Sequence, residues 1–117
     1  MKDILIIEDD MAIAHMLADL LLMAGYAVRQ AENGRVGLDL LEQHIPALIL
    51  CDVMMPILDG RAVCQHIQAT PRYHAIPLVM MSAGWVDLAE CSYTAFLPKP
   101  FELPDLLNLI SSLIGSA

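Results

Sequence analysis

Short apolar runs alternate along the whole chain with stretches in which apolar and polar residues are interleaved. An unbroken apolar run is typical of a strand buried on both faces of a parallel sheet. Apolar residues that recur every three or four positions predict a helix with one buried face. The pattern predicts strands at residues 3–7, 26–31, 47–51, 77–82 and 94–97. It predicts helices at residues 11–24, 35–44, 61–69 and 103–114, and a short helix near 86–90.

Strands and helices therefore alternate from one end of the sequence to the other. Alternation of this kind indicates an α/β fold, with a parallel sheet that carries helices on both faces. Right-handed crossovers restrict the winding of the sheet to a few topologies. Gly25 and Pro46 fit the boundaries, because glycine commonly ends a helix and proline interrupts regular structure. We expect one domain over residues 1–117.

Polar side chains follow the carboxyl ends of most of the predicted strands. They are Glu8 and Asp9 after the first strand, Asp52 after the third, Ser82 at the end of the fourth and Lys99 after the fifth. Because the carboxyl ends of parallel strands meet at one edge of the sheet, we expect these groups to converge. Pro56 and Gly60 turn the chain away from the sheet just beyond Asp52.

The chemistry of these groups points to a phosphoryl site. Three neighbouring carboxylates would raise one another's pKa values unless a cation held them, and Mg²⁺ prefers oxygen ligands of this kind. A lysine and a hydroxyl, here Lys99 and Ser82, suit the oxygens of a phosphoryl group. Asp52 would then be the acceptor and would form an aspartyl phosphate.

The composition narrows the range of partners. The chain has 6 basic and 14 acidic residues and a net charge of −8, which argues against direct binding of nucleic acid or of an anionic membrane. Apolar residues make up 57% of the chain, but no apolar run is long enough to span a bilayer, and no signal peptide is evident. We therefore expect a cytoplasmic protein. Three cysteines without metal-site spacing indicate reduced thiols, not a disulfide framework or a zinc site.

Four motifs occur in a characteristic order: ILIIEDD at 4–10, CDVMMPILDG at 51–60, MMSA at 80–83 and FLPKPF at 96–101. Together they resemble the response-regulator receiver domains of two-component signalling, the CheY-like family. The resemblance implies a flavodoxin-like, doubly wound sheet of five parallel strands in the order 2-1-3-4-5.

The resemblance also implies a metal site. Glu8 and Asp9 match the acidic pair that holds Mg²⁺, with Asp9 as the direct ligand. Asp52 matches the phosphorylated aspartate, which also touches the metal, and Met54 matches the position whose backbone carbonyl binds it.

Three further positions match residues that respond to the phosphoryl group. Ser82 matches the hydroxyl that grips it and moves on activation, and Lys99 matches the lysine that pairs with it. Phe96 matches the aromatic switch residue, whose rotamer follows the hydroxyl. The peptide bond between Lys99 and Pro100 is expected to be cis.

The implied function is a phosphorylation-dependent switch. A histidine kinase or a histidine phosphotransfer protein, docking near the first helix, would supply the phosphoryl group to Asp52 in a Mg²⁺-dependent step. The domain would then signal to a partner or to an appended output domain. It would not be an enzyme beyond its own phosphorylation and slow autodephosphorylation.

The sequence departs from the family pattern in two places. Glu8 stands where aspartate is more common, which should preserve metal binding. The interval from Ser82 to Lys99 is shorter than usual by more than one helical turn of about four residues, which predicts a shortened fourth helix. In this family that helix usually belongs to the output or dimer surface. Whether the chain forms a homodimer, and through which surface, is therefore left undecided by the sequence.

Two other functions compete with the switch. One is a pseudo-receiver, a protein-interaction module that is not regulated by phosphorylation; the full set of polar residues argues against it. The other is a phosphatase with an aspartyl nucleophile. Such enzymes need a second acid two residues after the nucleophile, and Met54 occupies that position.

Overall fold

The computed structural model describes residues 2–117. Its strands are β1 (Asp3–Ile7), β2 (Ala27–Ala31), β3 (Leu48–Asp52), β4 (Leu78–Ser82) and β5 (Ala95–Pro98). Its helices are α1 (Met11–Met23), α2 (Gly34–Gln43), α3 (Gly60–Ala69) and α4 (Leu103–Ile114). The predicted strands and the four longer predicted helices are thus confirmed, with boundaries that differ by a residue or two.

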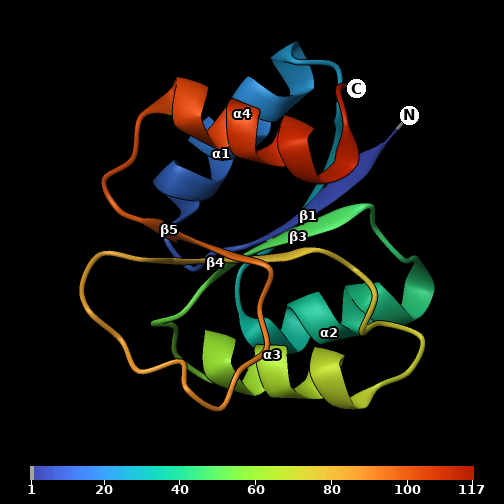
Figure 1. Cartoon of the computed structure of the whole chain (residues 1–117), viewed down its shortest axis with the longest axis vertical. Coiled ribbons are helices and arrows are strands. Elements are labelled where there is room, and N and C mark those ends of the chain that lie inside the picture. Colours follow the sequence, from blue (N-terminus) through green and yellow to red (C-terminus); the bar gives the residue numbers. More distant parts are fainter. Residues whose placement is uncertain (1) are drawn as a thin grey trace.

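The five strands form one parallel sheet in the order β2-β1-β3-β4-β5 (Figure 1). This is the flavodoxin-like order that the motifs implied. The central strands β3 and β4 are buried along their whole length, whereas the edge strands β2 and β5 are partly exposed. Burial on both faces is the reason that the central strands have continuous apolar sequences.

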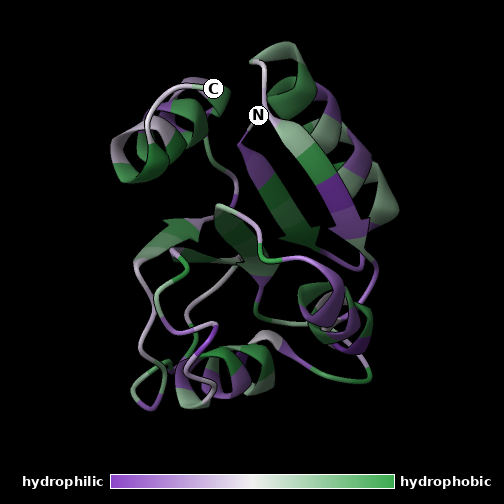
Figure 2. Ribbon diagram, turned by 90° about the vertical axis from the view of Figure 1, so that its right-hand side faces the viewer, coloured by the Kyte–Doolittle hydropathy of each residue, from purple (hydrophilic) through white to green (hydrophobic). Residues whose placement is uncertain are grey.

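Two helices cover each face of the sheet (Figure 1). Ile4 and Ile6 point to the face covered by α1 and α4, where they pack with residues such as Leu17. Leu5 and Ile7, in the same strand, point to the face covered by α2 and α3. Successive side chains of a strand point to opposite faces, so one apolar run supplies both halves of the core. Figure 2 shows this apolar sheet between the helices.

Side chains fix where the helices begin and end. The Asp10 carboxylate accepts hydrogen bonds from the first-turn N–H groups of α1, and Asn33 and Asp59 cap α2 and α3 in the same way. Such caps satisfy N–H groups that have no partner inside the helix. Gly25 follows α1 with a φ of +99°, a left-handed conformation that glycine adopts readily.

The prediction of a short helix near 86–90 is wrong. Residues 83–94 cross from β4 to β5 as irregular chain with a turn near 89–90, so the fourth helix of the predicted fold is absent here, not shortened. Val86 and Leu88 both pack on the core at the α2 and α3 face. Side chains two residues apart share one face of an extended chain but not of a helix, which explains the difference.

Within residues 2–117, none of the helices combines the length and the hydropathy that crossing a membrane requires.

Candidate functional site

Three carboxylates meet at the carboxyl edge of the sheet, where the parallel strands end. Glu8 and Asp9 follow β1, and Asp52 ends the neighbouring strand β3, one step beyond the paired residues Ile7 and Cys51. One oxygen from each carboxylate lies within 4.8 Å of the others. The predicted convergence of these three acids is therefore confirmed.

Lys99 places its ammonium group among these acids. Its Nζ atom lies 2.5 Å from Glu8 Oε1 and 3.2 Å from Asp52 Oδ1, with a side chain that is only 15% exposed. The backbone N–H of Lys99 donates to the carbonyl oxygen of Ser82 at 2.8 Å. Ser82 is buried at the end of β4, the strand next to β3, so all five predicted polar residues lie at one edge.

The site holds more negative than positive charge. Burial raises the pKa of the Glu8 carboxyl above its ordinary value, and the Lys99 ammonium offsets this only in part. Burial likewise raises the pKa of Asp52, again against the influence of Lys99. Burial alone would lower the pKa of Lys99, but the hydrogen bond to Glu8 and the charge of Asp52 raise it. A further cation would therefore stabilise the ionised carboxylates.

The donor set fits a small divalent cation. All three side chains offer carboxylate oxygens, which Mg²⁺ prefers, and no thiol or imidazole belongs to the cluster. Asp9 is exposed, so the cluster opens to solvent on one side, which suits an ion that keeps several waters.

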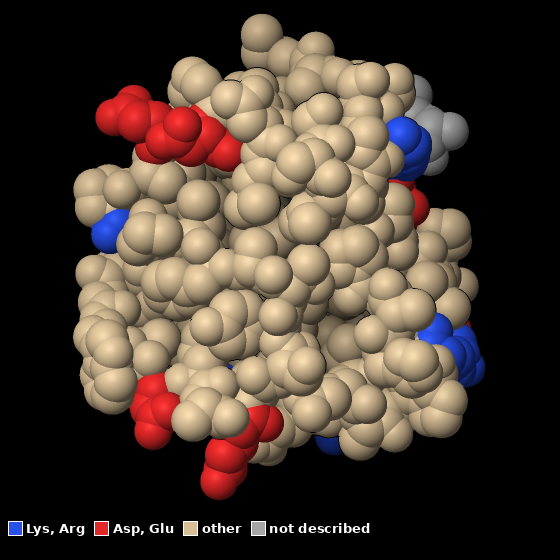
Figure 3. Space-filling view, in the orientation of Figure 1, with Lys and Arg blue, Asp and Glu red and all other residues tan. Residues whose placement is uncertain are grey.

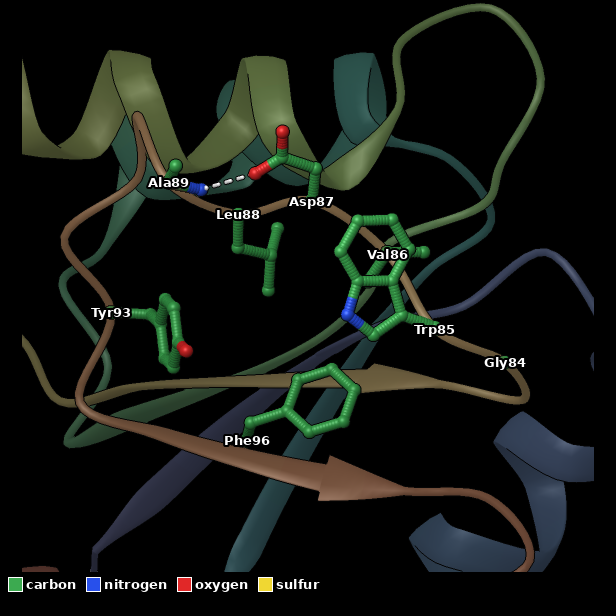
Figure 4. Close-up of a pocket in the computed structure, with 8 residues that line it drawn as sticks. All are labelled: Gly84, Trp85, Val86, Asp87, Leu88, Ala89, Tyr93 and Phe96. Atoms are coloured by element: carbon green, nitrogen blue, oxygen red, sulfur yellow. Dashed lines mark hydrogen bonds between the residues drawn. The ribbon is translucent and has the colours of Figure 1, made fainter.

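Two predicted residues lie farther along the chain. Met54 follows β3 with a side chain that is 60% exposed, and the metal-binding role of its carbonyl stays a prediction. Phe96 lies on β5 opposite Met80 and lines a cavity of about 420 Å³ beneath residues 84–93 (Figure 4). Its role as a switch also stays a prediction. The peptide bond between Lys99 and Pro100 is cis, as expected.

Gly60 supports the site in a way that the sequence pattern did not reveal. A Cβ atom at this position would lie 2.4 Å from the carbonyl oxygen of Asp52 and 2.7 Å from Val53 Cα. The N–H of Gly60 also donates to the Val53 carbonyl at 2.8 Å. The first turn of α3 therefore packs directly on the backbone of the phosphoacceptor candidate. In the sequence, Gly60 indicated only a turn.

Comparison with known proteins agrees with this geometry. The family model of the response regulator receiver domain matches residues 4–111. The DNA-binding dual master transcriptional regulator RpaA of Synechocystis is 36% identical in an alignment 119 positions long that covers 97% of this chain and 49% of RpaA. The response regulator MprA of Mycolicibacterium vanbaalenii is 34% identical over 95% of this chain and 49% of its own length. The chain thus spans about half the length of these relatives.

Solved structures share the fold. The signal receiver domain of a signal transduction histidine kinase from Syntrophus aciditrophicus superposes with a TM-score of 0.93 at 29% identity, over 97% of this chain and 90% of that domain. The chemotaxis protein CheY4 of Vibrio cholerae superposes with a TM-score of 0.89 at 25% identity, over 97% and 98% of the two chains. The motifs, the strand order, the edge site and these matches together show that the chain belongs to the response regulator receiver domain family.

Proposed function

We propose that the chain is a phosphoacceptor switch in which Asp52 takes a phosphoryl group from a phosphohistidine of a histidine kinase or a phosphotransfer protein. One observation carries this proposal: the Lys99 ammonium lies between the carboxylates of Glu8 and Asp52, with Asp9 beside them. A carboxylate nucleophile, a fixed cation and a cluster of metal-binding acids are the parts that phosphoryl transfer requires.

In the proposed reaction, an oxygen of the Asp52 carboxylate attacks the phosphorus atom. The bond from phosphorus to the donor nitrogen breaks, and its electron pair leaves with the imidazole. Lys99 holds a phosphoryl oxygen by charge, and the Ser82 hydroxyl donates a hydrogen bond to another. A Mg²⁺ ion held by Glu8, Asp9 and Asp52 would neutralise the charge that builds up on these oxygens.

Phosphorylation would change the conformation of the neighbouring chain through a movement of Ser82. In the structure the Ser82 hydroxyl oxygen lies 3.5 Å from the N–H of Gly84, at the start of the irregular segment 83–94. Phe96 lines the cavity under the same segment. A hydroxyl drawn toward a phosphoryl group would therefore move the chain that covers Phe96, which is the proposed conformational switch.

The proposed phosphodonor docks beside α1. Met16, Leu22 and Met23 expose apolar side chains on this helix, and exposed apolar surface often marks a site of partner contact. A largely apolar groove also runs between Ile13 and Met16 of α1 and the segment at Phe101, and Lys99 forms one wall of it. A partner seated there would bring its phosphohistidine to Asp52.

RpaA is named as a DNA-binding regulator, and we propose that this chain likewise acts through a partner or an attached output domain.

Incubation with phosphoramidate and Mg²⁺, followed by measurement of bound and released phosphate, separates the candidate functions. A switch should accumulate about one phosphoryl group per chain and release it slowly. A phosphatase should release many equivalents, and a pseudo-receiver should take up none. The Asp52→Asn variant serves as the blank, and either of the last two results would refute the proposal.

A further inference from the structure

Cys64 and Cys91 come together from distant parts of the chain. Cys64 is buried on α3, and Cys91 lies in the segment that replaces the expected helix. The Cys91 thiol lies 3.7 Å from the carbonyl oxygen of Arg61, and the N–H of Ser92 donates to Gln68 Oε1 at 2.8 Å. Arg61 and Gln68 lie about one turn before and one turn after Cys64 on α3. Cys91 therefore lies against the turn of the helix that carries Cys64.

The two thiols are direct neighbours in one core. Both pack in the apolar cluster on the α2 and α3 face of the sheet. Burial, together with the contact with the Cys91 thiol, raises the pKa of the Cys64 thiol to about 12. Cys64 is therefore a thiol at neutral pH and is a poor starting point for exchange, whereas Cys91 is partly exposed.

We propose that Cys64 and Cys91 form a reversible disulfide on exposure to a small-molecule disulfide, and that this bond fastens the segment 83–94 to α3. Cys91 loses its proton, and its sulfur attacks one sulfur of the reagent, so that the reagent's S–S bond breaks and one thiolate leaves. Cys64 then loses its proton and attacks the Cys91 sulfur, which expels the second thiolate. Two protein thiols are oxidised, and one reagent disulfide is reduced to two thiols.

The surroundings favour this pair over the remaining cysteine. Cys51 is fully buried in the central strand β3, where burial raises the pKa of its thiol well above the ordinary value. A disulfide needs close and specific geometry, so at least one partner must be able to adjust. Cys91 belongs to irregular chain and can move, whereas Cys51 and Cys64 are each held in regular structure.

The proposed bond acts on a segment next to the candidate site. Residues 83–94 begin directly after Ser82 and cover the cavity that Phe96 lines (Figure 4). Joining Cys91 to α3 would restrict how far this segment can move. The amide hydrogens of residues 84–93 should therefore exchange more slowly in the oxidised protein than in the reduced protein.

The test uses the whole folded chain with oxidised glutathione. We expect the intact mass to fall by about 2 Da, the mass of two hydrogen atoms. Peptide mapping should join Cys64 to Cys91 and leave Cys51 open to alkylation after unfolding, and dithiothreitol should restore the original mass. Cys91→Ser should abolish the change, whereas Cys51→Ala should retain it.

Three results would overturn the proposal: thiols that stay free, a stable adduct of glutathione on Cys91, or a bond between Cys51 and Cys64. If Cys64→Ala fails to fold, the partly exposed Cys91→Ser variant still decides the question. The assay needs neither Mg²⁺ nor a phosphodonor, so its outcome is independent of the proposed phosphorylation.

Discussion

Asp52 carries its charge in surroundings that do not fully balance it. Its carboxylate is buried beside Glu8 and close to Asp9, and Lys99 provides one positive charge for the group. Burial raises the pKa of both Glu8 and Asp52, so the ionised site is less stable than the same groups in water. Functional sites are often less stable than the surrounding fold allows, because their charges are placed for a ligand.

The raised carboxyl pKa values predict how stability depends on pH. Without divalent cations, the free energy of unfolding should increase as the pH falls from neutral toward the ordinary values of 4.5 for Glu8 and 3.8 for Asp52. The folded state binds these protons more tightly than the unfolded state, so protonation favours folding in this window. Because the pKa of Lys99 is raised, its ammonium stays charged over this whole pH range. Its contribution to the free energy of unfolding is lost only in alkali.

Asp52→Asn should flatten this pH dependence and raise the stability at pH 7 by about 1 kcal/mol. Urea unfolding over a pH series in EDTA measures both effects. Asp19→Asn, on the exposed face of α1, is the matched control and should change neither. A loss of stability in Asp52→Asn at pH 7 would show that the carboxylate is already fully compensated.

At the scale of the elements, the sequence pattern predicted the strands and helices whose apolar residues recur with a clear period. Continuous apolar runs identified β3 and β4, and the clean stripe of α4 identified the last helix. Ends of strands then placed Glu8, Asp52 and Lys99 at one edge, because parallel strands end together. Periodicity could not settle residues 83–94, where a few apolar residues in a short stretch fit a helix or an extended chain. Contacts between distant segments, such as Cys64 with Cys91, also leave no local signal.

Gly60 joins α3 to the site and offers a sharp test of that packing. Gly60→Ala should destabilise the fold by about 2 kcal/mol, because the new Cβ would clash with backbone atoms of Asp52 and Val53 that cannot easily move. Gly84→Ala is the matched control, since a Cβ there meets nothing within 4 Å. Thermal or urea unfolding of both variants measures the difference. Equal stabilities would mean that α3 can shift away from β3 without cost.

At the scale of the whole molecule, the sheet separates two cores but brings the ends of its strands to one edge. The helix pairs on the two faces hold the strands in register, and the site depends on that register (Figure 1). On the face drawn in Figure 3, the charged side chains form small groups around the margin of a largely uncharged surface. The net charge of −8 and the cluster at the edge should both favour a cation over an anion.

Mg²⁺ should therefore stabilise the folded chain. The midpoint of thermal unfolding should rise with Mg²⁺ concentration at pH 7, because an ion that binds only the folded state shifts the equilibrium toward it. The rise should be smaller at pH 5, where protons compete for the carboxylates, and smaller in Asp9→Asn. Asp105→Asn, in the first turn of α4, is the control. An equal rise in all variants would indicate general screening of charge and not a site.

The phosphoacceptor role of Asp52 is tested most sharply by the intact mass of the chain after reaction with phosphoramidate, with and without Mg²⁺, in the original sequence and in Asp52→Asn. We expect one adduct of about 80 Da that maps to Asp52, requires Mg²⁺ and is absent from Asp52→Asn. An unmodified chain under all conditions, or equal labelling of Asp52→Asn, would contradict it.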